Sequence, residues 1–387
     1  MTTAMPSEYQ GFEQGPIRPP SEAYSLLIRV TRNCPWNRCL FCPVYKGAAF
    51  SVRPVDHVRR DIDLVHRLVE ALRASADGAG HVRHAAYVAI ARGTPPEERD
   101  ALRAAYHWVA VGGMRSVFLQ DANSLFARTG DLVAILEHLR ARFPAIERIT
   151  SYARAHTAAR KSDQELRDLA AAGLNRVHIG MESGADAVLA FMKKGVTQAE
   201  HVAAGRKVKA AGMELSEYIM PGLGGRPLSE VHARESADAL NRINPDFIRL
   251  RTLAIPANTP LYEEYEAGRF DKCTDVETVR EIRLFIASLD GVSSVVASDH
   301  ILNLIGELEG RLPEDQPAMF ALLDRFLAMS PEDQTVFQIG RRMGAFASLD
   351  DLEHPDRRAI AENACRQYGI TPENVGGVLD AIMRQFI

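Results

Sequence analysis

Residues 24–42 read YSLLIRVTRNCPWNRCLFC, a short apolar strand followed directly by a loop that carries three cysteines. Cys34, Cys39 and Cys42 are separated by four and then by two residues. Three thiolates on one loop can hold three irons of a [4Fe–4S] cubane and leave the fourth iron open, whereas structural zinc is usually closed by four ligands. The spacing therefore favours an iron–sulfur cluster. A zinc site completed by His57, or three unrelated buried cysteines, are the alternatives.

Strands and helices alternate in the sequence that follows. Six short, mostly apolar strands are expected to begin at residues 24, 116, 148, 176, 214 and 247, with a seventh candidate at 292–298. The intervals show helical spacing of apolar residues, and Ser162 with Glu165 matches a capping box. This alternation predicts an α/β fold with a parallel sheet, a partial (β/α)6 TIM-like barrel with a helical C-terminal extension.

The expected organisation has three parts. We expect an N-terminal arm at residues 1–22, the partial barrel at residues 23–300, and a helical C-terminal domain at residues 301–387. Only helical patterns, interrupted by prolines, are found in the last part.

The composition is that of an ordinary globular protein, with 46% hydrophobic and 25% charged residues. The formal net charge of −4 argues against bulk electrostatic capture of nucleic acid or membrane. No signal-peptide pattern opens the sequence, and no stretch approaches about 18 consecutive apolar residues. With only five cysteines, a disulfide framework is not expected. We therefore expect a cytoplasmic protein without membrane contact.

Two further segments agree with the cysteine loop. Phe41 stands directly before the last cysteine, and HIGMESG at residues 178–184 is followed by FMKKGVT at residues 191–197. Together these segments resemble the radical S-adenosylmethionine (SAM) superfamily, in particular oxygen-independent coproporphyrinogen oxidase, Elongator-type tRNA-modifying enzymes and methylthiotransferases. The resemblance covers about residues 20–260. It departs at the cysteine loop, where the family commonly has one residue fewer between the first two cysteines.

The resemblance implies a set of cofactor-binding residues. Phe41 belongs to the cluster loop, and Glu182 and Lys194 occupy positions that contact SAM in the subgroup. Glu217 occupies the position of an acidic residue that reaches the SAM ribose. As alternatives, Gly180 merely breaks the strand while Glu182 caps the next helix, or a neighbouring residue of the fifth strand replaces Glu217.

Gln120 and Asp121 follow the second strand, where the resembled family has a glycine-rich motif that binds the SAM amino group. The glycine pair is absent here, but a carboxylate and an amide can take an ammonium group through charge-assisted hydrogen bonds. We therefore include both residues among the cofactor-binding candidates. An Asx turn that closes the loop is the alternative.

Polar residues also follow the last candidate strands. Asp299 and His300 are expected at the carboxyl ends of the strands, where we predict substrate contact or proton transfer. Helix capping by Ser298 or Asp299 is the competing interpretation. Arg249 and Arg251 share one strand face by their period-two spacing, and could pair with a substrate carboxylate, with SAM or with a structural acidic partner.

The resemblance implies an oxygen-sensitive radical SAM oxidoreductase or transferase with a [4Fe–4S] cluster and SAM as cofactors. In such enzymes the reduced cluster cleaves SAM, and the 5′-deoxyadenosyl radical abstracts hydrogen from a substrate. The acidic balance favours a small organic substrate, with flavodoxin or ferredoxin as reductant. One alternative is a tRNA-modifying radical SAM enzyme, which predicts a basic face around Arg341 and Arg342. The other is a non-catalytic zinc-binding protein.

Overall fold

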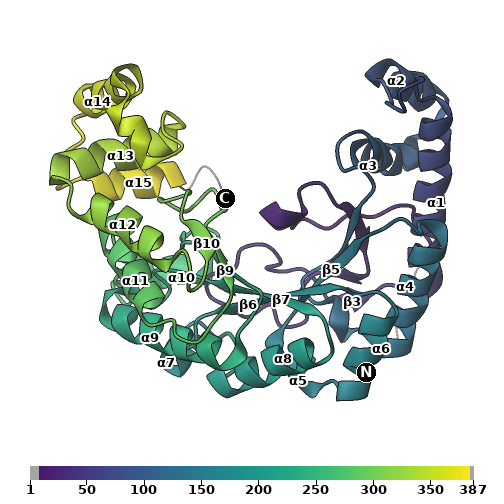
Figure 1. Ribbon diagram of the computed structural model, residues 1–387, viewed down its shortest axis with the longest axis horizontal. Coiled ribbons are helices and arrows are strands. Elements are labelled where there is room, and N and C mark those ends of the chain that lie inside the picture. The colour runs from purple at the N-terminus through teal and green to yellow at the C-terminus, as the bar shows by residue number, and fades with distance from the viewer. Residues whose placement is uncertain (1–7, 384–387) are drawn as a thin grey trace. The chain divides into compact units, whose positions relative to one another are not determined.

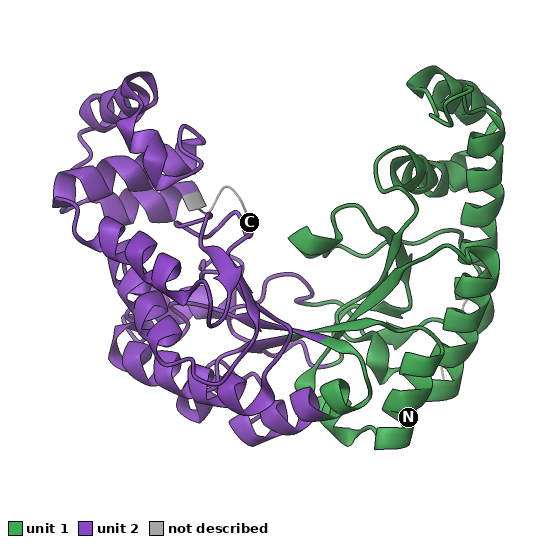
Figure 2. Ribbon diagram, in the orientation of Figure 1, with its two compact units in different colours: residues 1–35, 47–179, 207–214 green, residues 36–46, 180–206, 215–387 purple. Residues whose placement is uncertain are grey.

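The computed structural model describes residues 8–383, and the chain divides into two compact units. Unit 1, green in Figure 2, contains Met1–Pro35, Gly47–Ile179 and Lys207–Glu214. Unit 2, purple, contains Trp36–Lys46, Gly180–Arg206 and Leu215–Ile387. The boundary falls within the cysteine loop of the sequence, so that Cys34 belongs to unit 1 while Cys39 and Cys42 belong to unit 2.

Unit 1 is built on parallel strands in the order β1-β4-β5-β6 (Figure 1). Their register places Leu27 beside Phe118 and Tyr152 beside His178. A short antiparallel pair, β2 and β3, accompanies them. The bounds are β1 (Leu26–Arg29), β2 (Thr31–Arg32), β3 (Ser51–Val52), β4 (Ser116–Gln120), β5 (Arg148–Ala153) and β6 (Arg176–Glu182), the last of which continues into unit 2.

Amphipathic helices cover the strands of unit 1. Helix α1 buries Val58, Ile62 and Val65 at three- and four-residue spacing and packs against α3 and α4. Helix α6 begins after Ser162, whose hydroxyl accepts from the Glu165 N–H in the predicted capping box. The helices are α1 (Val55–Ala74), α2 (His84–Gly93), α3 (Arg99–Ala110), α4 (Thr129–Arg142), α5 (Ala155–Arg160) and α6 (Asp163–Ala171), with 3-10 turns at Pro20–Glu22, Pro96–Glu98 and Ser124–Phe126.

The N-terminal arm is attached to unit 1 by polar contacts. The Tyr9 hydroxyl donates to Asp61 at 2.9 Å, and the Gly15 N–H donates to Oε1 of Gln120 at 2.8 Å. Residues 1–7 of the predicted arm lie outside the described residues. The part of the arm that the structure describes is thus held by side chains of α1 and β4.

Unit 2 contains strands in the order β7-β8-β9-β10, of which the first three are parallel and β10 is antiparallel to β9. Helix α9 packs against α11, and α11 packs against α12 (Figure 1). The bounds are β7 (Glu214–Ile219), β8 (Phe247–Leu250), β9 (Val295–Ala297) and β10 (Glu309–Arg311), with helices α7 (Asp186–Phe191), α8 (Gln198–Ala210), α9 (Gly225–Ile243), α10 (Pro260–Glu266) and α11 (Asp275–Ala287). The end of α8 and the first residue of β7 belong to unit 1.

Helices dominate the C-terminal part of unit 2. They are α12 (Gln316–Leu327), α13 (Pro331–Met343), α14 (Pro355–Tyr368) and α15 (Val375–Met383), with a 3-10 turn at Leu349–Glu353. Helix α13 packs against both α14 and α15. Across residues 8–383, no helix combines the length and apolar character that crossing a membrane requires.

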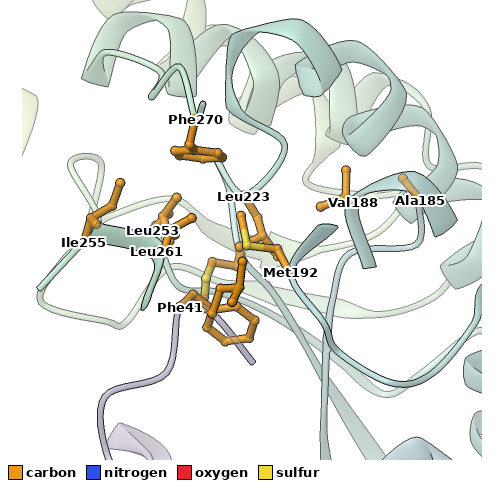
Figure 3. Packing of buried hydrophobic residues seen from close by; sticks show 11 residues of the cluster. Phe41, Ala185, Val188, Met192, Leu223, Leu253, Ile255, Leu261 and Phe270 are labelled. Carbon is orange, nitrogen blue, oxygen red and sulfur yellow. The ribbon is translucent and has the colours of Figure 1, made fainter. Parts of the chain in front are cut away.

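A hydrophobic cluster in unit 2 lies directly against the cysteine loop (Figure 3). Phe41 is 9% exposed and belongs to the same cluster as Met192, Leu253 and Phe270. Cys39 and Cys42 pack against this cluster from the loop. Since burial of one such large apolar side chain contributes about 1.5–3 kcal/mol, the cluster anchors the loop through the side chain between its last two cysteines.

The predicted α/β class with parallel strands is confirmed, and the elements are those of a partial TIM-like fold. All six predicted strands are present, and the seventh candidate is β9. It is shorter than the predicted 292–298 because the Ser293 N–H and the Ser294 hydroxyl donate to Asn244 and Pro245. Strand β10 was not predicted. The boundaries predicted after residues 22 and 300 stay a prediction.

Candidate active site

The cysteine loop is clamped on two sides within unit 2. The Leu40 N–H donates to the Met192 carbonyl at 3.0 Å, and the Leu40 carbonyl accepts from the Leu261 N–H at 3.0 Å. Cys39 and Cys42 are partly exposed, and neither forms a disulfide bond. The backbone is therefore fixed where the thiols remain accessible to a metal.

Polar side chains also hold the longer segment between Cys34 and Cys39. Asn37 has φ of +49°, a left-handed conformation that Asn tolerates better than most residues, and its amide donates to the Tyr45 carbonyl. Lys46 Nζ donates to the carbonyls of Asn37 at 3.1 Å and Cys39 at 2.8 Å. Lys46 thus brings a positive charge to a loop whose thiolates would be negative, and the sequence analysis missed it.

Three of the predicted cofactor-binding residues come together in unit 2. Lys194 Nζ lies 3.2 Å from Oε1 of Glu182, and the two side chains are only 12% and 14% exposed. The same ammonium lies 5.6 Å from the ring centroid of Phe41, within cation–π range. Gly180 makes room for the pair, because a Cβ at this position would lie 2.3 Å from the Glu182 carboxylate. The glycine therefore does more than interrupt the strand.

Glu217, near the end of β7, is fully buried. Neither of its carboxylate oxygens has a hydrogen-bond partner within residues 8–383. Burial raises the pKa of Glu217 well above the ordinary value; the positive Lys194 opposes this rise, and the negative charge of Glu182 adds to it. Leaving a buried polar group without a partner costs about 1–3 kcal/mol, so this carboxyl group is suited to a ligand that supplies the missing donor.

A buried polar network supports the segments after β6 and β7. The Ser183 hydroxyl lies 2.8 Å from His232 Nδ1, and His232 Nε2 lies 3.1 Å from the Met220 carbonyl. Glu281 accepts from the Gly222 N–H at 2.6 Å. The ends of the strands that carry the candidate carboxylates are thus fixed to α9 and α11.

This supporting network was not predicted from the sequence. A signal for it exists in α11, where Glu281 lies among the buried residues Thr278, Ile282 and Phe285 at helical spacing. An acidic residue on an apolar helix face must find a partner when it is buried. The pattern could therefore have identified Glu281, although not the backbone N–H that it binds.

A pocket in unit 2 adjoins Cys42 and receives side chains from the cysteine loop, from the segment after β7 and from the segments after β8 and β9. Arg251 lies on its wall and forms no ion pair with any residue between 8 and 383. The lining includes Phe41, Cys42, Met220, Arg251, Thr252 and Leu302.

Gln120 and Asp121 lie in unit 1, and both are fully buried. The Gln120 amide accepts from the Gly15 N–H at 2.8 Å and donates to the Ile17 carbonyl at 2.7 Å. Asp121 Oδ2 accepts from the Arg29 guanidinium at 2.8 Å. These partners belong to the arm and to β1, and a cofactor-binding role for either residue stays a prediction.

Asp299 and His300 follow β9 in unit 2. Asp299 Oδ2 pairs with Arg249 Nη1 at 2.5 Å, so the structural ion pair is the option that Arg249 adopts. Burial, with the positive Arg251 as a second cause, lowers the pKa of His300 to about 4. Nδ1 of His300 accepts from the Leu302 N–H at 3.2 Å. His300 is therefore neutral at pH 7, with the proton on Nε2, and the catalytic roles stay predictions.

Arg341 and Arg342 of α13 are engaged by backbone carbonyls. Arg341 Nε donates to Leu304 and Arg342 Nη1 donates to Leu302, each at 3.0 Å. Arg342 is only 8% exposed. These two residues tie α13 to the segment after His300, and they do not form the exposed basic face that tRNA recognition would require.

The candidate ligands of the iron–sulfur cluster are the three cysteines of the loop. In the described part of the chain, no three His, Cys, Asp or Glu side chains are arranged to hold a metal ion. Cys34, Cys39 and Cys42 are nevertheless all partly exposed and form no disulfide bond, and thiolate is the donor that iron–sulfur clusters take. The donor set fits a cluster, and ligation by these three residues stays a prediction.

The chain is similar to two curated proteins at low identity. A tRNA uridine(34) acetyltransferase of Methanocaldococcus jannaschii is 22% identical over 260 residues, which are 64% of this chain and 46% of that protein. The chain thus spans about half the length of the curated relatives it matches.

Two solved structures are similar at low identity. One is the Elp3 protein of Methanocaldococcus infernus, with 16% identity, a TM-score of 0.39 and coverage of 48% of each chain. The other is coproporphyrinogen III oxidase of Escherichia coli, with 14% identity, a TM-score of 0.45 and coverage of 68% of this chain and 51% of that one.

The radical SAM superfamily pattern matches residues 28–235, more than half of the chain. The match includes all three loop cysteines and the segments that carry Glu182, Lys194 and Glu217. The chain therefore belongs to the radical SAM superfamily, an enzyme superfamily whose cofactors are a [4Fe–4S] cluster and S-adenosylmethionine.

Proposed function

We propose that Cys34, Cys39 and Cys42 hold the [4Fe–4S] cluster, and that Glu182, Lys194 and Glu217 bind SAM for hydrogen abstraction from a small organic substrate. The observation that carries this proposal is Glu217, a fully buried carboxyl group without a hydrogen-bond partner in the described residues. Such a group is costly in the free protein, and a ligand that brings hydroxyl donors offsets this cost.

The proposed roles follow from charge and burial. Glu217 accepts hydrogen bonds from the ribose hydroxyls, and the Lys194 ammonium takes the SAM carboxylate in exchange for part of its contact with Glu182. When bound, the reduced cluster supplies the electron that cleaves the sulfonium bond of SAM.

Charge also supports a small substrate. The net charge is −4, and the two arginines on which a basic face was predicted are engaged with backbone carbonyls. A polyanion would need many phosphate contacts, each supplied by an exposed cation. His300, neutral and close to Arg251, is the proposed hydrogen-bond donor to the substrate through its Nε2–H, and Asp299 pairs with Arg249.

The test is SAM cleavage under anaerobic conditions. The purified protein is reconstituted with iron and sulfide and reduced with dithionite, and 5′-deoxyadenosine is measured by mass spectrometry. We expect product from the native chain and none from Cys34→Ala, Cys39→Ala or Cys42→Ala. A colourless protein that retains zinc, or a Cys39→Ala variant with full cluster content, contradicts the proposal.

The curated relatives favour a second candidate, because they are named as tRNA-modifying enzymes. Under this alternative the same SAM site acts on a nucleoside within tRNA. RNA that co-purifies with the native chain, together with SAM cleavage that is stimulated by tRNA and not by small metabolites, would support the alternative over a small substrate.

A further inference from the structure

The pocket beside Cys42 carries one positive charge on a mostly apolar wall. Its lining combines the ring of Phe41, which Figure 3 shows within the hydrophobic cluster, with the side chains of Met220 and Leu302. Apart from the Cys42 thiol, Arg251 is the one basic or acidic side chain among the described residues that line the pocket. Pockets for small molecules are mostly apolar, with a few polar groups that fix the orientation of the ligand, and Arg251 has the position of such a group.

The backbone that carries Arg251 is fixed on both sides. Arg251 directly follows β8, and its N–H donates to the Ile219 carbonyl at 3.0 Å. The N–H and the hydroxyl of the next residue, Thr252, donate to Asn303 Oδ1 at 2.8 Å and 3.0 Å. Asn303 Nδ2 in turn donates to the Leu250 carbonyl at 2.8 Å. The base of the Arg251 side chain is therefore held in place before a ligand arrives, which lowers the entropic cost of binding.

The guanidinium of Arg251 differs from that of Arg249, two residues earlier in the chain, because it lacks a partner. Arg249 Nη1 pairs with Asp299 Oδ2 at 2.5 Å. Arg251 is half-buried, and within residues 8–383 its guanidinium forms neither an ion pair nor a hydrogen bond. A charge that is partly removed from water without a counter-charge is destabilising, and a bound anion relieves this cost. The contrast between the two arginines indicates that Arg251 serves a ligand.

The groups around Arg251 leave one positive charge for that ligand. The charge of Arg249 is balanced by Asp299. His300 is neutral at pH 7, because burial and the charge of Arg251 lower its pKa to about 4. The Nε2–H of His300 thus adds a donor without adding a charge. One positive charge matches a monoanion such as a carboxylate, whereas a phosphate ester carries a charge of about −2.

We infer that the substrate is a small monocarboxylic acid, whose carboxylate pairs with Arg251 while its carbon chain lies against Phe41, Met220 and Leu302. The inference rests on the proposed function and names the substrate class of that same site. A planar guanidinium can donate two parallel hydrogen bonds to the two oxygens of one carboxylate. Arg251 is then a specificity-determining residue, since a neutral molecule of the same size leaves the guanidinium unpaired.

The carboxylate of SAM is the competing occupant, and the position of Lys194 favours the substrate. Lys194 Nζ lies 3.2 Å from Glu182 Oε1 and 5.6 Å from the ring centroid of Phe41. Lys194 is not among the described residues that line the pocket of Arg251. Two cations at two places therefore serve two carboxylates, that of SAM at Lys194 and that of the substrate at Arg251.

The experiment compares probes of similar size and different charge. Butyrate, butyramide and ethyl phosphate are titrated at constant ionic strength into the reconstituted, SAM-loaded protein, and each Kd is measured by saturation-transfer-difference NMR. The native chain is compared with Arg251→Gln and Arg251→Lys. Arg280→Gln removes an exposed arginine of unit 2 and serves as the matched control. Cluster content and SAM affinity are measured on all four proteins.

We expect the native chain to bind butyrate at least about tenfold more tightly than butyramide, since hydrogen bonds between charged groups are the stronger ones. Arg251→Gln should abolish this preference, because it removes the charge. Arg251→Lys keeps the charge without the planar fork and should restore part of the preference. Arg280→Gln should bind both probes as the native chain does.

The inference is overturned if the native chain binds butyrate no more tightly than butyramide, or binds ethyl phosphate more tightly than butyrate. It is also overturned if Arg251→Gln loses as much affinity for SAM as for butyrate, because Arg251 would then hold the SAM carboxylate. Failure of the native chain to cleave SAM with dithionite is a different result. It overturns the proposed function, whereas the binding of butyrate is measured without SAM cleavage.

Discussion

Two fully buried carboxyl groups, Glu22 in unit 1 and Glu217 in unit 2, show opposite solutions to the same physical problem. Burial alone raises the pKa of Glu22, but His178, the Ser25 hydroxyl and the positive Arg148 outweigh it and lower the pKa to about 2. Ser25 Oγ donates at 2.5 Å and Arg148 Nη2 at 3.2 Å. The described residues supply Glu217 with no hydrogen-bond donor, and its pKa is raised.

The difference separates a structural carboxylate from one suited to a ligand. Glu22 contacts Arg148, the first residue of β5, and so lies where the parallel strands of unit 1 begin. Glu217 lies near the carboxyl end of β7. In folds built from parallel β/α units, active sites lie at the carboxyl ends of the strands, while contacts at the other ends serve stability.

The largest expected effect is on stability, in Glu22→Gln. The lowered pKa corresponds to about 3 kcal/mol of stabilisation at pH 7, because a tenfold change in a proton dissociation constant equals about 1.4 kcal/mol. This stabilisation is present above the unfolded-state pKa near 4.5 and is lost as the pH falls towards 2. Urea unfolding at pH 7 and at pH 3 should show a large loss for the variant at pH 7 and a smaller one at pH 3.

The exposed residue Glu230 provides the control for this measurement. Glu230→Gln should unfold like the native chain at both pH values. If Glu22→Gln lost the same free energy of unfolding at pH 7 and pH 3, the carboxylate charge would not be what its partners stabilise. Glu22 would then be held by packing alone.

The second effect concerns ligand affinity. Glu217→Ala should weaken SAM binding by about 30-fold, since a hydrogen bond to a buried carboxyl group contributes about 2 kcal/mol. Equilibrium dialysis with the reconstituted protein measures this, and Glu22→Gln, folded at pH 7, should bind SAM as the native chain does. If both variants bound SAM equally well, the distinction between the two carboxyl groups would be lost.

Glu22 and Glu217 also show how much of the two sites could be predicted from the sequence. Glu217 could be identified because it lies in a recognisable strand, in a segment that resembles known enzymes. Its lack of a partner could not, because that depends on side chains of other elements. Glu22 gave no signal at all, since its burial is produced by Arg148 and His178, more than 100 residues away in sequence.

The helices and strands could be predicted where they are long enough to show a periodic pattern of apolar residues. The buried strands and amphipathic helices have the length for a period to appear, and the predicted strands were found. Strand β10 has three residues, Glu309–Arg311, two of them exposed and charged, so no apolar pattern marks it. The contacts of Gln120 and Asp121 could not be predicted for a different reason. Both residues contact segments far away in sequence, the arm and Arg29, which no local pattern indicates.

The third effect tests the room around Glu182. Gly180→Ala places a methyl group 2.3 Å from the Glu182 carboxylate, which must move away from Lys194. We expect SAM affinity to fall by about tenfold, or about 1.4 kcal/mol, with iron and sulfide content unchanged. Gly130→Ala, in open space, is the matched control. Equal SAM affinity in both variants would mean that Glu182 and Lys194 do not bind SAM as a pair.

The smallest effect is on the pH dependence of stability in the SAM-free protein. Because the folded-state pKa of Glu217 is raised, the folded chain binds this proton more tightly than the unfolded chain. Its contribution to stability therefore falls as the pH rises above the unfolded-state pKa near 4.5. Glu217→Gln cannot ionise, so its stability relative to the native chain should be higher at pH 8 than at pH 5. Glu22→Gln changes the slope of stability against pH in the opposite sense, which makes the two variants controls for each other in one set of urea titrations. A Glu217→Gln variant that differed from the native chain by the same amount at both pH values would mean that the Glu217 carboxylate already has a partner, and its assignment to a ligand would fail.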